Sequence, residues 1–273
     1  QDSRWGIMDT LTNMAELMSR GGGVGINVST LRPKNARVEG VNGRSSGAVS
    51  WAALYSYVTG LIEQAGSRRG ALMLILNDWH PDVFRFISSK ETAGNIINAN
   101  ISVGISDALM EAVEADADWT LRFPDTKHEA YDKEWVGNLE AWIESGYPVI
   151  EYETIKARKL WDKITQSAWK SAEPGLWFRS HSNNMSNSYY YPEGYLTATN
   201  PCVTGDTLVS TSLGIKTMEE LYRTQADFQV VTDSRFGTDT MQPSSRVIQT
   251  GIKPVFKLTT DDGYTLKATA DHQ

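Results

Sequence analysis

The sequence predicts an α/β fold for residues 1–201, followed by a small all-β segment at residues 202–273. Three observations support this prediction. The stretch ALMLIL, residues 71–76, is apolar on both faces, as a buried parallel strand is. Segments with apolar residues at helical spacing alternate with such short apolar runs, which favours a parallel sheet or barrel. After Cys202 the pattern changes to short strands separated by Gly, Asp and Pro turns.

In the first part, helices and strands are expected to alternate. Apolar residues at helical spacing between Ile7 and Met18 predict a helix that ends at a run of three glycines. The Trp-rich stretch 114–146 fits neither the helix nor the strand pattern. The other expected elements are strand 24–28, polar loop 30–47, helix 51–64, strand 71–76, short helix 81–88, strand 101–105, a helix from 107, helix 154–172 and strand 176–178.

The second part is expected to be almost free of helices. One helix is predicted at residues 217–223. Short runs rich in Val, Ile, Thr and Phe, bounded by turn residues, predict the strands. These strands are expected at residues 207–210, 229–232, 246–249, 254–260 and 264–268.

Composition limits the function classes. The chain has 273 residues and a net charge of −7, so a broad nucleic-acid-binding surface is not expected. A single cysteine, Cys202, excludes an internal disulfide framework and fits a reducing cytoplasm. The longest aliphatic run is far too short to cross a bilayer, so no membrane partner is expected. Because the chain opens on Gln1 without a methionine and stops abruptly at Gln273, we expect a piece of a longer chain.

Two glycine-containing segments are candidates for holding phosphate. Backbone N–H groups of GGGVG, residues 21–25, can approach a phosphate closely, although such a cluster is also typical of a helix C-cap and turn. The segment QAGSRRGA places Arg68 and Arg69 side by side between a helix and the buried strand. Guanidinium groups donate to phosphate in pairs and stay charged when partly desolvated. A solvated basic turn is an equally weighted alternative.

Six motifs in order resemble the large catalytic subunit of ribonucleotide reductases. They are GGGVGINVSTLRP, SSGAVSW, QAGSRRGALM, WHPDVFRFI, NANISVGISD and TATNPC. The Asn-Pro-Cys spelling is most similar to the adenosylcobalamin-dependent class. The resemblance runs from Asp2 to Pro201, and it implies part of a ten-stranded α/β barrel with a finger loop at its centre.

The resemblance implies an allosteric effector site near the N-terminus. Asp2 and Ser3 match the start of the helix at which a deoxynucleotide effector is bound, and Arg32 matches an arginine that reaches the effector's phosphate. Taken without the resemblance, Asp2 is better explained as a helix N-cap and Arg32 as a surface charge.

The resemblance also implies a specificity loop and substrate contacts. The segment QAGSRRGA matches the loop between effector and substrate base, with Gln64 and Arg69 as its communicating side chains and Arg68 beside them. Ser45 and Ser46 match a small-residue segment near the substrate.

Asn200 and Cys202 match the tip of the finger loop, where the family carries its radical cysteine. The family's glutamate follows that cysteine by two residues, where this chain has Thr204. The family's redox-active cysteine would precede Gln1, and the remaining barrel strands would follow Gln273. We therefore expect this piece alone to be inactive as a reductase.

A second ordered set of motifs begins at the same cysteine. CVTGDTLV, GIKPVFKL and LKATADH resemble the N-terminal half of an intein, a Hint-type domain. The resemblance implies that the thiol of Cys202 attacks the carbonyl of Pro201 and forms a thioester. His272 would protonate the leaving nitrogen, and Thr269 would help to hold the scissile segment. Cys202 therefore occupies the position of the family's radical cysteine, but its predicted role is that of the splicing nucleophile.

The two resemblances predict a ribonucleotide reductase precursor that carries an intein and serves deoxyribonucleotide and DNA synthesis. The implied cofactor is adenosylcobalamin, and the implied ligands are a ribonucleotide substrate and a deoxynucleotide or ATP effector. The implied partner is a thioredoxin- or glutaredoxin-type reductant. A second copy in a homodimer is a further candidate. The intein is either truncated in this sequence or split, and a split intein would have a complementary C-terminal fragment as its partner. No metal-ligating residues are assigned.

Three alternatives stay open. The first is the large subunit of the iron-dependent class I, which shares the barrel and its loops. The second is a nucleotide-binding regulatory protein without radical chemistry. The third makes residues 202–273 an autoprocessing domain that only cleaves its host.

Overall fold

The computed structural model describes residues 1–19, 23–38, 43–64, 68–91, 96–185, 195–199, 208–224, 227–231, 241–243, 247, 255–259 and 265–269. The chain divides into two compact units, Gln1–Pro201 and Cys202–Gln273. The two units are described separately below.

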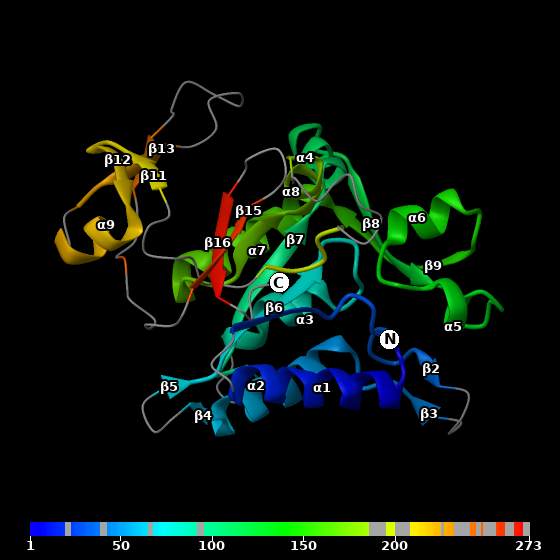
Figure 1. The fold of residues 1–273 in the computed structure, drawn as a ribbon. Coiled ribbons are helices and arrows are strands. Elements are labelled where there is room, and N and C mark those ends of the chain that lie inside the picture. The colour runs from blue at the N-terminus through cyan, green and yellow to red at the C-terminus, as the bar shows by residue number, and fades with distance from the viewer. Residues whose placement is uncertain are drawn as a thin grey trace. The chain divides into compact units, whose positions relative to one another are not determined.

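The first unit is built on a four-stranded parallel sheet with the order β1-β6-β7-β10 (Figure 1). The strands are β1 (Gly23–Asn27), β6 (Ala71–Asn77), β7 (Asn100–Ile105) and β10 (Gly175–Phe178). Each neighbouring pair is parallel, so the carboxyl ends of all four strands meet at one edge. The predicted α/β fold with a parallel sheet is confirmed.

The two faces of this sheet differ in chemistry. The apolar face carries Leu72, Leu74, Leu76, Ile101, Val103 and Ile105, all buried in one hydrophobic core. Residues one position along each strand point to the opposite side. This opposite side, called the polar face below, carries Gly25 and Asn27 of β1, Met73, Ile75 and Asn77 of β6, and Asn100, Ser102 and Gly104 of β7.

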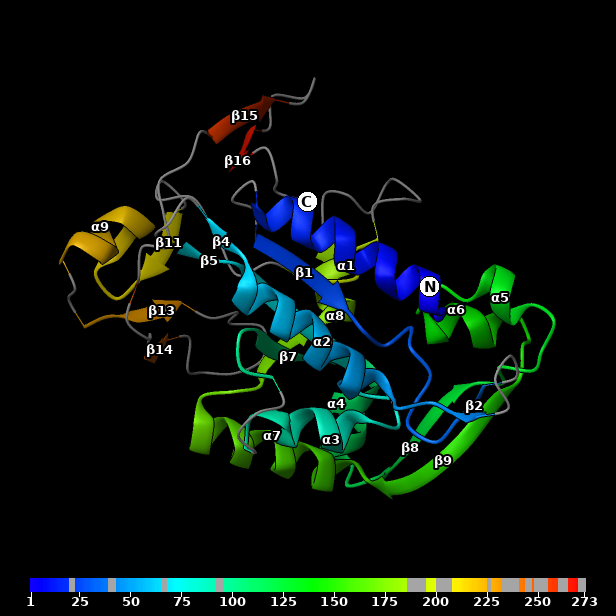
Figure 2. The ribbon, with the colours of Figure 1, turned by 90° about the horizontal axis from the view of Figure 1, so that it is seen from below.

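Helices pack on the apolar face. They are α1 (Arg4–Ser19), α2 (Ala48–Leu61), α3 (Val83–Ile87), α4 (Asp107–Glu114) and α7 (Ala157–Ser171), with a 3₁₀ turn at Ser88–Lys90. All five contribute to the same hydrophobic core, and in Figure 2 α1 and α2 lie next to each other, as do α3 and α7. A further helix, α8 (Arg179–Met185), follows β10 directly.

An antiparallel arm extends from the sheet. It pairs β8 (Asp118–Pro124) with β9 (Val149–Lys156) and carries α5 (Tyr131–Glu134) and α6 (Leu139–Glu144) in the connection. A second hydrophobic cluster fills the space beneath these helices. It contains Trp79, Phe123, Ala130, Tyr131, Trp135, Leu139 and Trp142.

Two short hairpins lie in the predicted polar loop and the predicted specificity loop. The first pairs β2 (Arg37–Val38) with β3 (Gly43–Arg44), and the second pairs β4 (Glu63–Gln64) with β5 (Arg68–Arg69). Sequence periodicity gave no sign of these two-residue strands, because neither is long enough to show an alternation.

Three predicted elements need correction. The helix expected at 51–64 covers Ala48–Leu61 instead, and Glu63–Gln64 form the strand β4. The helix expected from Thr154 begins at Ala157, because Thr154 and Ile155 lie in β9 and pair with Thr120 and Trp119 of β8. The strand at 176–178 exists but is not buried throughout: Leu176 and Phe178 are 39% and 41% exposed, and only Trp177 is buried.

In the second unit, β12 (Gly214–Thr217), β11 (Leu208–Thr211), β13 (Gln229–Val231) and β14 (Met241–Pro243) form an antiparallel sheet in that order. A separate hairpin pairs β15 (Val255–Thr259) with β16 (Thr265–Thr269). One helix, α9 (Met218–Thr224), confirms the predicted helix. Of the strand expected at 246–249, Val247 alone is described, and it lies outside any strand.

Candidate functional site

Buried polar side chains gather where the parallel strands end. In sheets of this kind, ligands bind in the crevice outside the carboxyl ends of the strands. Unpaired polar groups are costly to bury, so such a collection needs a set of mutual hydrogen bonds. The residues concerned are Ser29 after β1, Asn77, Asp78, His80 and Asp82 at and after the end of β6, Ser106 after β7, and Arg179 and Asn183 after β10.

The loop between β1 and β2 is held by two aromatic side chains. Trp135 Nε1 donates to the carbonyl of Thr30 (2.9 Å), and His80 Nε2 lies 2.8 Å from the carbonyl of Leu31. Burial lowers the pKa of His80, so the ring is neutral. Its Nδ1 accepts from the backbone N–H of Asp82 (3.0 Å), which leaves the ring proton on Nε2, where it can be donated to Leu31.

Asp82 joins the same loop to the start of α2. Its buried carboxylate accepts from the backbone N–H of Lys34 (3.2 Å) and of Ala48 (2.9 Å). Gly47 has φ +90°, and a Cβ there would lie 2.4 Å from Asp82 Oδ2. Glycine at this position therefore makes room for the carboxylate as well as for the turn.

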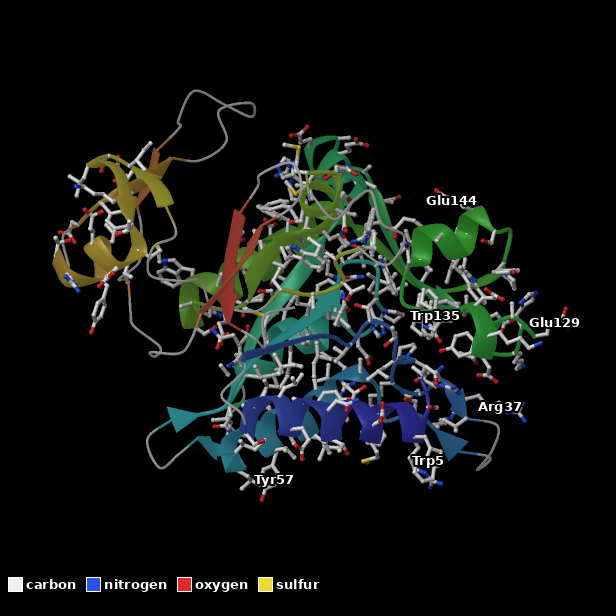
Figure 3. All side chains as sticks on the ribbon, in the orientation of Figure 1. Trp5, Arg37, Tyr57, Glu129, Trp135 and Glu144 are labelled. Carbon is white, nitrogen blue, oxygen red and sulfur yellow. The ribbon has the colours of Figure 1, made fainter. Side chains whose placement is uncertain are left out.

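Two of the predicted effector residues meet at this loop. Arg32 Nε donates to Asp2 Oδ2 (2.5 Å), and the hydroxyl of Tyr131 donates to the same oxygen (2.7 Å). Arg32 also donates to the carbonyl of Arg37 (3.0 Å) and lies 5.7 Å from the Tyr131 ring centroid. Burial opposes the charge of Arg32, but the ion pair with Asp2 outweighs it and raises the Arg32 pKa. Figure 3 shows Trp135 and Arg37 on this side of the unit.

Ser3 and Ser45 have structural partners, and Ser46 lies at the surface. Ser3 Oγ accepts from the N–H of Gly6 (3.0 Å), which is a cap for the first turn of α1, so Ser3 rather than Asp2 caps this helix. Ser45 Oγ accepts from Gly47 N–H (3.0 Å) and lies 3.4 Å from the Arg32 carbonyl. Ser46 is exposed in the turn before α2.

A network of charges links the arm to the end of β6. Arg179 is buried and pairs with Glu140 through both terminal nitrogens, one at 3.1 Å and one closer. Its Nη2 lies 3.9 Å from Asp78 Oδ1, while Asp78 Oδ2 accepts from the N–H and hydroxyl of Ser106, both at 2.6 Å. Burial raises the pKa of Asp78. Burial opposes ionisation of Glu140 too, but its bonds to Arg179 lower the Glu140 pKa.

The remaining predicted residues are described only in part. Gln64 pairs with Arg68 in the β4–β5 ladder, and Arg69 pairs with Glu63; the side chains of all four lie outside the described part of the structure. Thr269 is the last residue of β16 and pairs with Val255, again without a described side chain. Asn200, Cys202 and His272 lie outside the described residues.

Several residues of this edge were missed by sequence reasoning. Asn27, Asp78, Tyr131, Glu140 and Arg179 received no predicted role. His80 and Asp82 stood in a quoted motif without one. A usable signal was present for Asp78, because it directly follows β6, whose run at residues 71–76 is apolar on both faces.

A cavity of about 170 Å³ lies between α1, α2 and the end of β1, with Thr10, Asn27, Thr30 and Tyr55 among its lining residues. Pockets for drug-sized ligands measure about 300–1,000 Å³, so this cavity alone is too small to enclose a nucleotide. Among the described residues there is no group of three or more His, Cys, Asp or Glu side chains placed to hold a metal ion. The helices in the described part are all too short or too polar to cross a bilayer.

Comparison with known proteins identifies the family of this chain. A family model described as "Ribonucleotide reductase, barrel domain" matches residues 1–206. The chain is 37% identical over 202 residues to the vitamin B12-dependent ribonucleoside-diphosphate reductase of Thermoplasma acidophilum, covering 74% of this chain and 23% of that protein. It is 33% identical over 199 residues to the ribonucleoside-diphosphate reductase large chain of Cryptosporidium parvum, covering 68% and 24%.

A vitamin B12-dependent ribonucleoside-diphosphate reductase of Mycobacterium tuberculosis is 34% identical over 203 residues, covering 74% of this chain and 25% of that protein. The chain thus spans about a quarter of the length of these relatives. The family match covers the parallel sheet, the arm and the whole polar edge described above. The chain therefore belongs to the ribonucleotide reductase family.

Proposed function

We propose that residues 1–201 form part of the catalytic barrel of a reductase that replaces the 2′-hydroxyl of a ribonucleotide by hydrogen. A cysteine thiyl radical starts the reaction. A thioredoxin- or glutaredoxin-type dithiol supplies two electrons and becomes a disulfide, and the hydroxyl leaves as water. The observation that carries this proposal is the barrel-domain match over residues 1–206, which includes the polar edge with its buried charges.

The effector of this enzyme is proposed to be a deoxynucleotide or ATP at Asp2, Ser3 and Arg32. The ion pair between Asp2 and Arg32 supports the pairing of these two residues, which are 30 positions apart. A carboxylate accepts from sugar hydroxyls, and a guanidinium donates to phosphate oxygens. Because the nearby cavity is small, the nucleotide would lie on an open surface that another part of the protein completes.

The β4–β5 hairpin is proposed to carry effector identity to the substrate through Gln64, Arg68 and Arg69, with Ser45 and Ser46 closer to the substrate. Its position supports this: the hairpin directly precedes β6, whose far end carries the polar edge. We expect Arg69→Ala in the complete enzyme to change effector-dependent substrate choice more than effector affinity. Arg158→Ala, at a half-exposed arginine that pairs with Asp116, is the matched control. Unchanged selectivity in Arg69→Ala would reject the assignment.

Adenosylcobalamin is proposed as the cofactor, because two of the matched relatives are named vitamin B12-dependent. The described residues contain no cluster of three or more metal-ligating side chains, and the buried His80 uses both ring nitrogens within the protein. No step is therefore assigned through the cofactor.

The iron-dependent class is the second candidate, since the large chains of Cryptosporidium parvum and Caenorhabditis elegans are 33% and 31% identical to this chain. Titration of the complete, spliced enzyme with adenosylcobalamin separates the two candidates. Saturable binding with activity supports the first. No binding, with activity restored by a di-iron partner protein, supports the second.

A homodimer is part of the proposal. Trp5 on α1 is 82% exposed and Tyr57 on α2 is 64% exposed, and in Figure 3 both side chains point away from the unit on the same side. Large exposed aromatic residues on adjacent helices are typical of protein interfaces. We expect Trp5→Glu to shift the complete enzyme from dimer to monomer in size-exclusion chromatography with light scattering. If the variant stays dimeric, Trp5 is not part of the dimer interface.

We further propose that Cys202 opens a self-splicing element. The Cys202 thiolate attacks the carbonyl carbon of Pro201; the bond from that carbon to the Cys202 nitrogen breaks, and the nitrogen gains a proton from His272. The product is a thioester from Pro201 to Cys202 Sγ with a free amine, and no redox partner is needed. Thr269 is proposed to hold the scissile segment, and a complementary C-terminal fragment to complete the element.

This second proposal is supported by where the family match stops. The match ends at residue 206, close to Cys202, where the second compact unit begins, and the described strands of that unit are antiparallel. In the complete precursor, Cys202→Ala should abolish thiol-induced cleavage after Pro201, while Cys202→Ser should retain slower cleavage through an ester. Cleavage that persists in Cys202→Ala would show that splicing does not begin at this residue.

A further inference from the structure

The segment Tyr195–Thr199, which leads to the Asn-Pro-Cys tip, contacts α8 and β1 at three successive places. Asn183 and Asn27 had no predicted role, and Gly25 belongs to the glycine cluster that was considered for phosphate. Two of the contacts use a side-chain amide, and the third depends on the absence of a side chain. They lie on α8 and on the polar face of β1.

The first contact is a two-way hydrogen bond from Asn183 on α8. Its Nδ2 donates to the carbonyl of Leu196 (3.0 Å), and its Oδ1 accepts from the N–H of Leu196 (2.7 Å). A neighbouring strand would satisfy both backbone groups in the same way. Asn183 is itself only 8% exposed and donates to the carbonyl of Arg179 (2.9 Å), so the amide is fixed within its helix.

The second contact comes from Asn27 at the carboxyl end of β1. Its Nδ2 donates to the carbonyl of Thr197 (2.8 Å) and to Asn77 Oδ1 (3.1 Å), and its Oδ1 accepts from the N–H of Ser29 (2.9 Å). The Thr197 carbonyl can only accept and the Ser29 N–H can only donate, so the amide nitrogen and oxygen of Asn27 cannot exchange places. Space for Asn77 comes from Gly104, where a Cβ would lie 2.4 Å from Asn77 Oδ1.

The third contact is a close approach of two backbones. A Cβ on Gly25 would lie 2.4 Å from the carbonyl oxygen of Thr199 and 2.9 Å from its carbon. Asn27 contacts Thr197, and Gly25 contacts Thr199. The residue number therefore falls along β1 while it rises along the segment. The segment therefore runs antiparallel to β1 over its polar face.

We propose that Asn183, Asn27 and Gly25 are positioning residues that fix the path of segment 195–199, which leads into the predicted finger-loop tip. This inference rests on the proposed function for the chemistry at the tip. Thr199 is bonded directly to Asn200. A shift in the position of Thr199 is therefore expected to shift Asn200 as well. The chain continues from Thr199 directly into Asn200, Pro201 and Cys202, so we expect a displaced segment to slow the chemistry proposed at Cys202. A misplacement of about 1 Å can cost about a hundredfold in rate.

The test combines two measurements on the complete precursor. Asn183→Leu keeps the size of the side chain and removes both bonds to Leu196. We expect hydrogen exchange at the Leu196 amide to rise at least about tenfold, because its acceptor is lost. We expect thiol-induced cleavage after Pro201 to slow at least about tenfold. Asn183→Asp, which keeps the acceptor for the Leu196 N–H, should restore part of both.

Gly25→Ala tests the same segment from the opposite side and should also slow cleavage. Asn98→Leu is the matched control, because Asn98 donates to the carbonyl of Ser56 (3.2 Å) away from the segment. Unchanged Leu196 exchange in Asn183→Leu, or unchanged cleavage in both Asn183→Leu and Gly25→Ala, overturns the inference. If the wild-type precursor does not cleave at all, the splicing proposal fails, and Leu196 exchange still decides whether the segment is held as inferred.

Discussion

The two sides of the parallel sheet are stabilised in different ways. The apolar face is covered by five helices, and its leucine, isoleucine and valine side chains contribute through burial, which has no preferred direction. The carboxyl edge and the polar face are held by individual hydrogen bonds between residues far apart in the sequence. The apolar face contributes most of the stability of the sheet. The hydrogen bonds of the polar face and the carboxyl edge fix the positions of a few charged and amide side chains.

This difference has consequences for substitution. A core tolerates swaps that conserve volume, since neighbouring side chains can adjust. A hydrogen-bonded edge does not, because removal of one partner leaves the other buried and unsatisfied. We therefore expect the apolar face to govern unfolding and the polar edge to govern function, and each prediction below tests that division.

The largest effect is expected from Leu74→Ala on the apolar face. Leu74 is completely buried in the middle of β6, so truncation leaves a cavity and should lower the free energy of unfolding by about 2–5 kcal/mol. Met73→Ala, on the polar face of the same strand and only half-buried, should cost clearly less. Urea denaturation followed by circular dichroism measures both. Equal losses would remove the distinction between the faces.

The next effect is expected from Asp82→Ala at the polar edge. The substitution leaves the N–H groups of Lys34 and Ala48 without their acceptor and should cost about 2–4 kcal/mol. It should also weaken effector binding, because the loop that carries Arg32 loses its link to α2. Asp125→Ala, which removes an acceptor from the exposed N–H of Lys127, is the control. Calorimetric titration with a deoxynucleotide should separate the two variants, and equal affinities would show that Asp82 has a structural role alone.

The apolar side could be predicted from the sequence, and most of the polar edge could not. The run at residues 71–76 and the helical spacing around Ile7 to Met18 gave correct elements, because burial produces a local period along the chain. Asp82 contacts a residue 48 positions away and Tyr131 contacts Asp2 across 129 positions, and neither contact leaves a periodic signal. The family resemblance paired Asp2 with Arg32 in one site, but it did not indicate Tyr131.

A smaller effect is expected from Tyr131→Phe, which removes one hydrogen bond and keeps the ring in the aromatic cluster. The loss should be about 1–2 kcal/mol, because the acceptor Asp2 is charged. Burial raises the pKa of Tyr131, so its hydroxyl stays protonated and the effect should be constant from pH 6 to about pH 9. Tyr147→Phe in the same cluster is the control. A cycle with Asp2→Asn should show coupling, and additive effects would contradict the direct bond.

The smallest effect is expected from Glu140→Gln, and it should depend on pH. The bonds to Arg179 outweigh burial and lower the Glu140 pKa in the folded state. A lowered pKa of an acid means that the unfolded chain takes up the proton first as the pH falls. The stability from this pair is therefore complete above the ordinary glutamate pKa of about 4.3 and is lost as the pH drops through the lower, folded value.

The magnitude should be about 1 kcal/mol at pH 7, because the Glu140 side chain is 49% exposed and solvent screens the pair. Urea denaturation of wild type and Glu140→Gln from pH 7 to pH 3 should show a difference that shrinks towards the acid end. Glu144→Gln, an exposed position on the same helix labelled in Figure 3, should leave the pH dependence unchanged. A difference that grows towards low pH would reverse the sign of the Glu140 contribution. The arm would then be held to the sheet mainly by its aromatic cluster. Burial of apolar side chains, rather than hydrogen bonds and ion pairs, would then stabilise this part of the polar edge too.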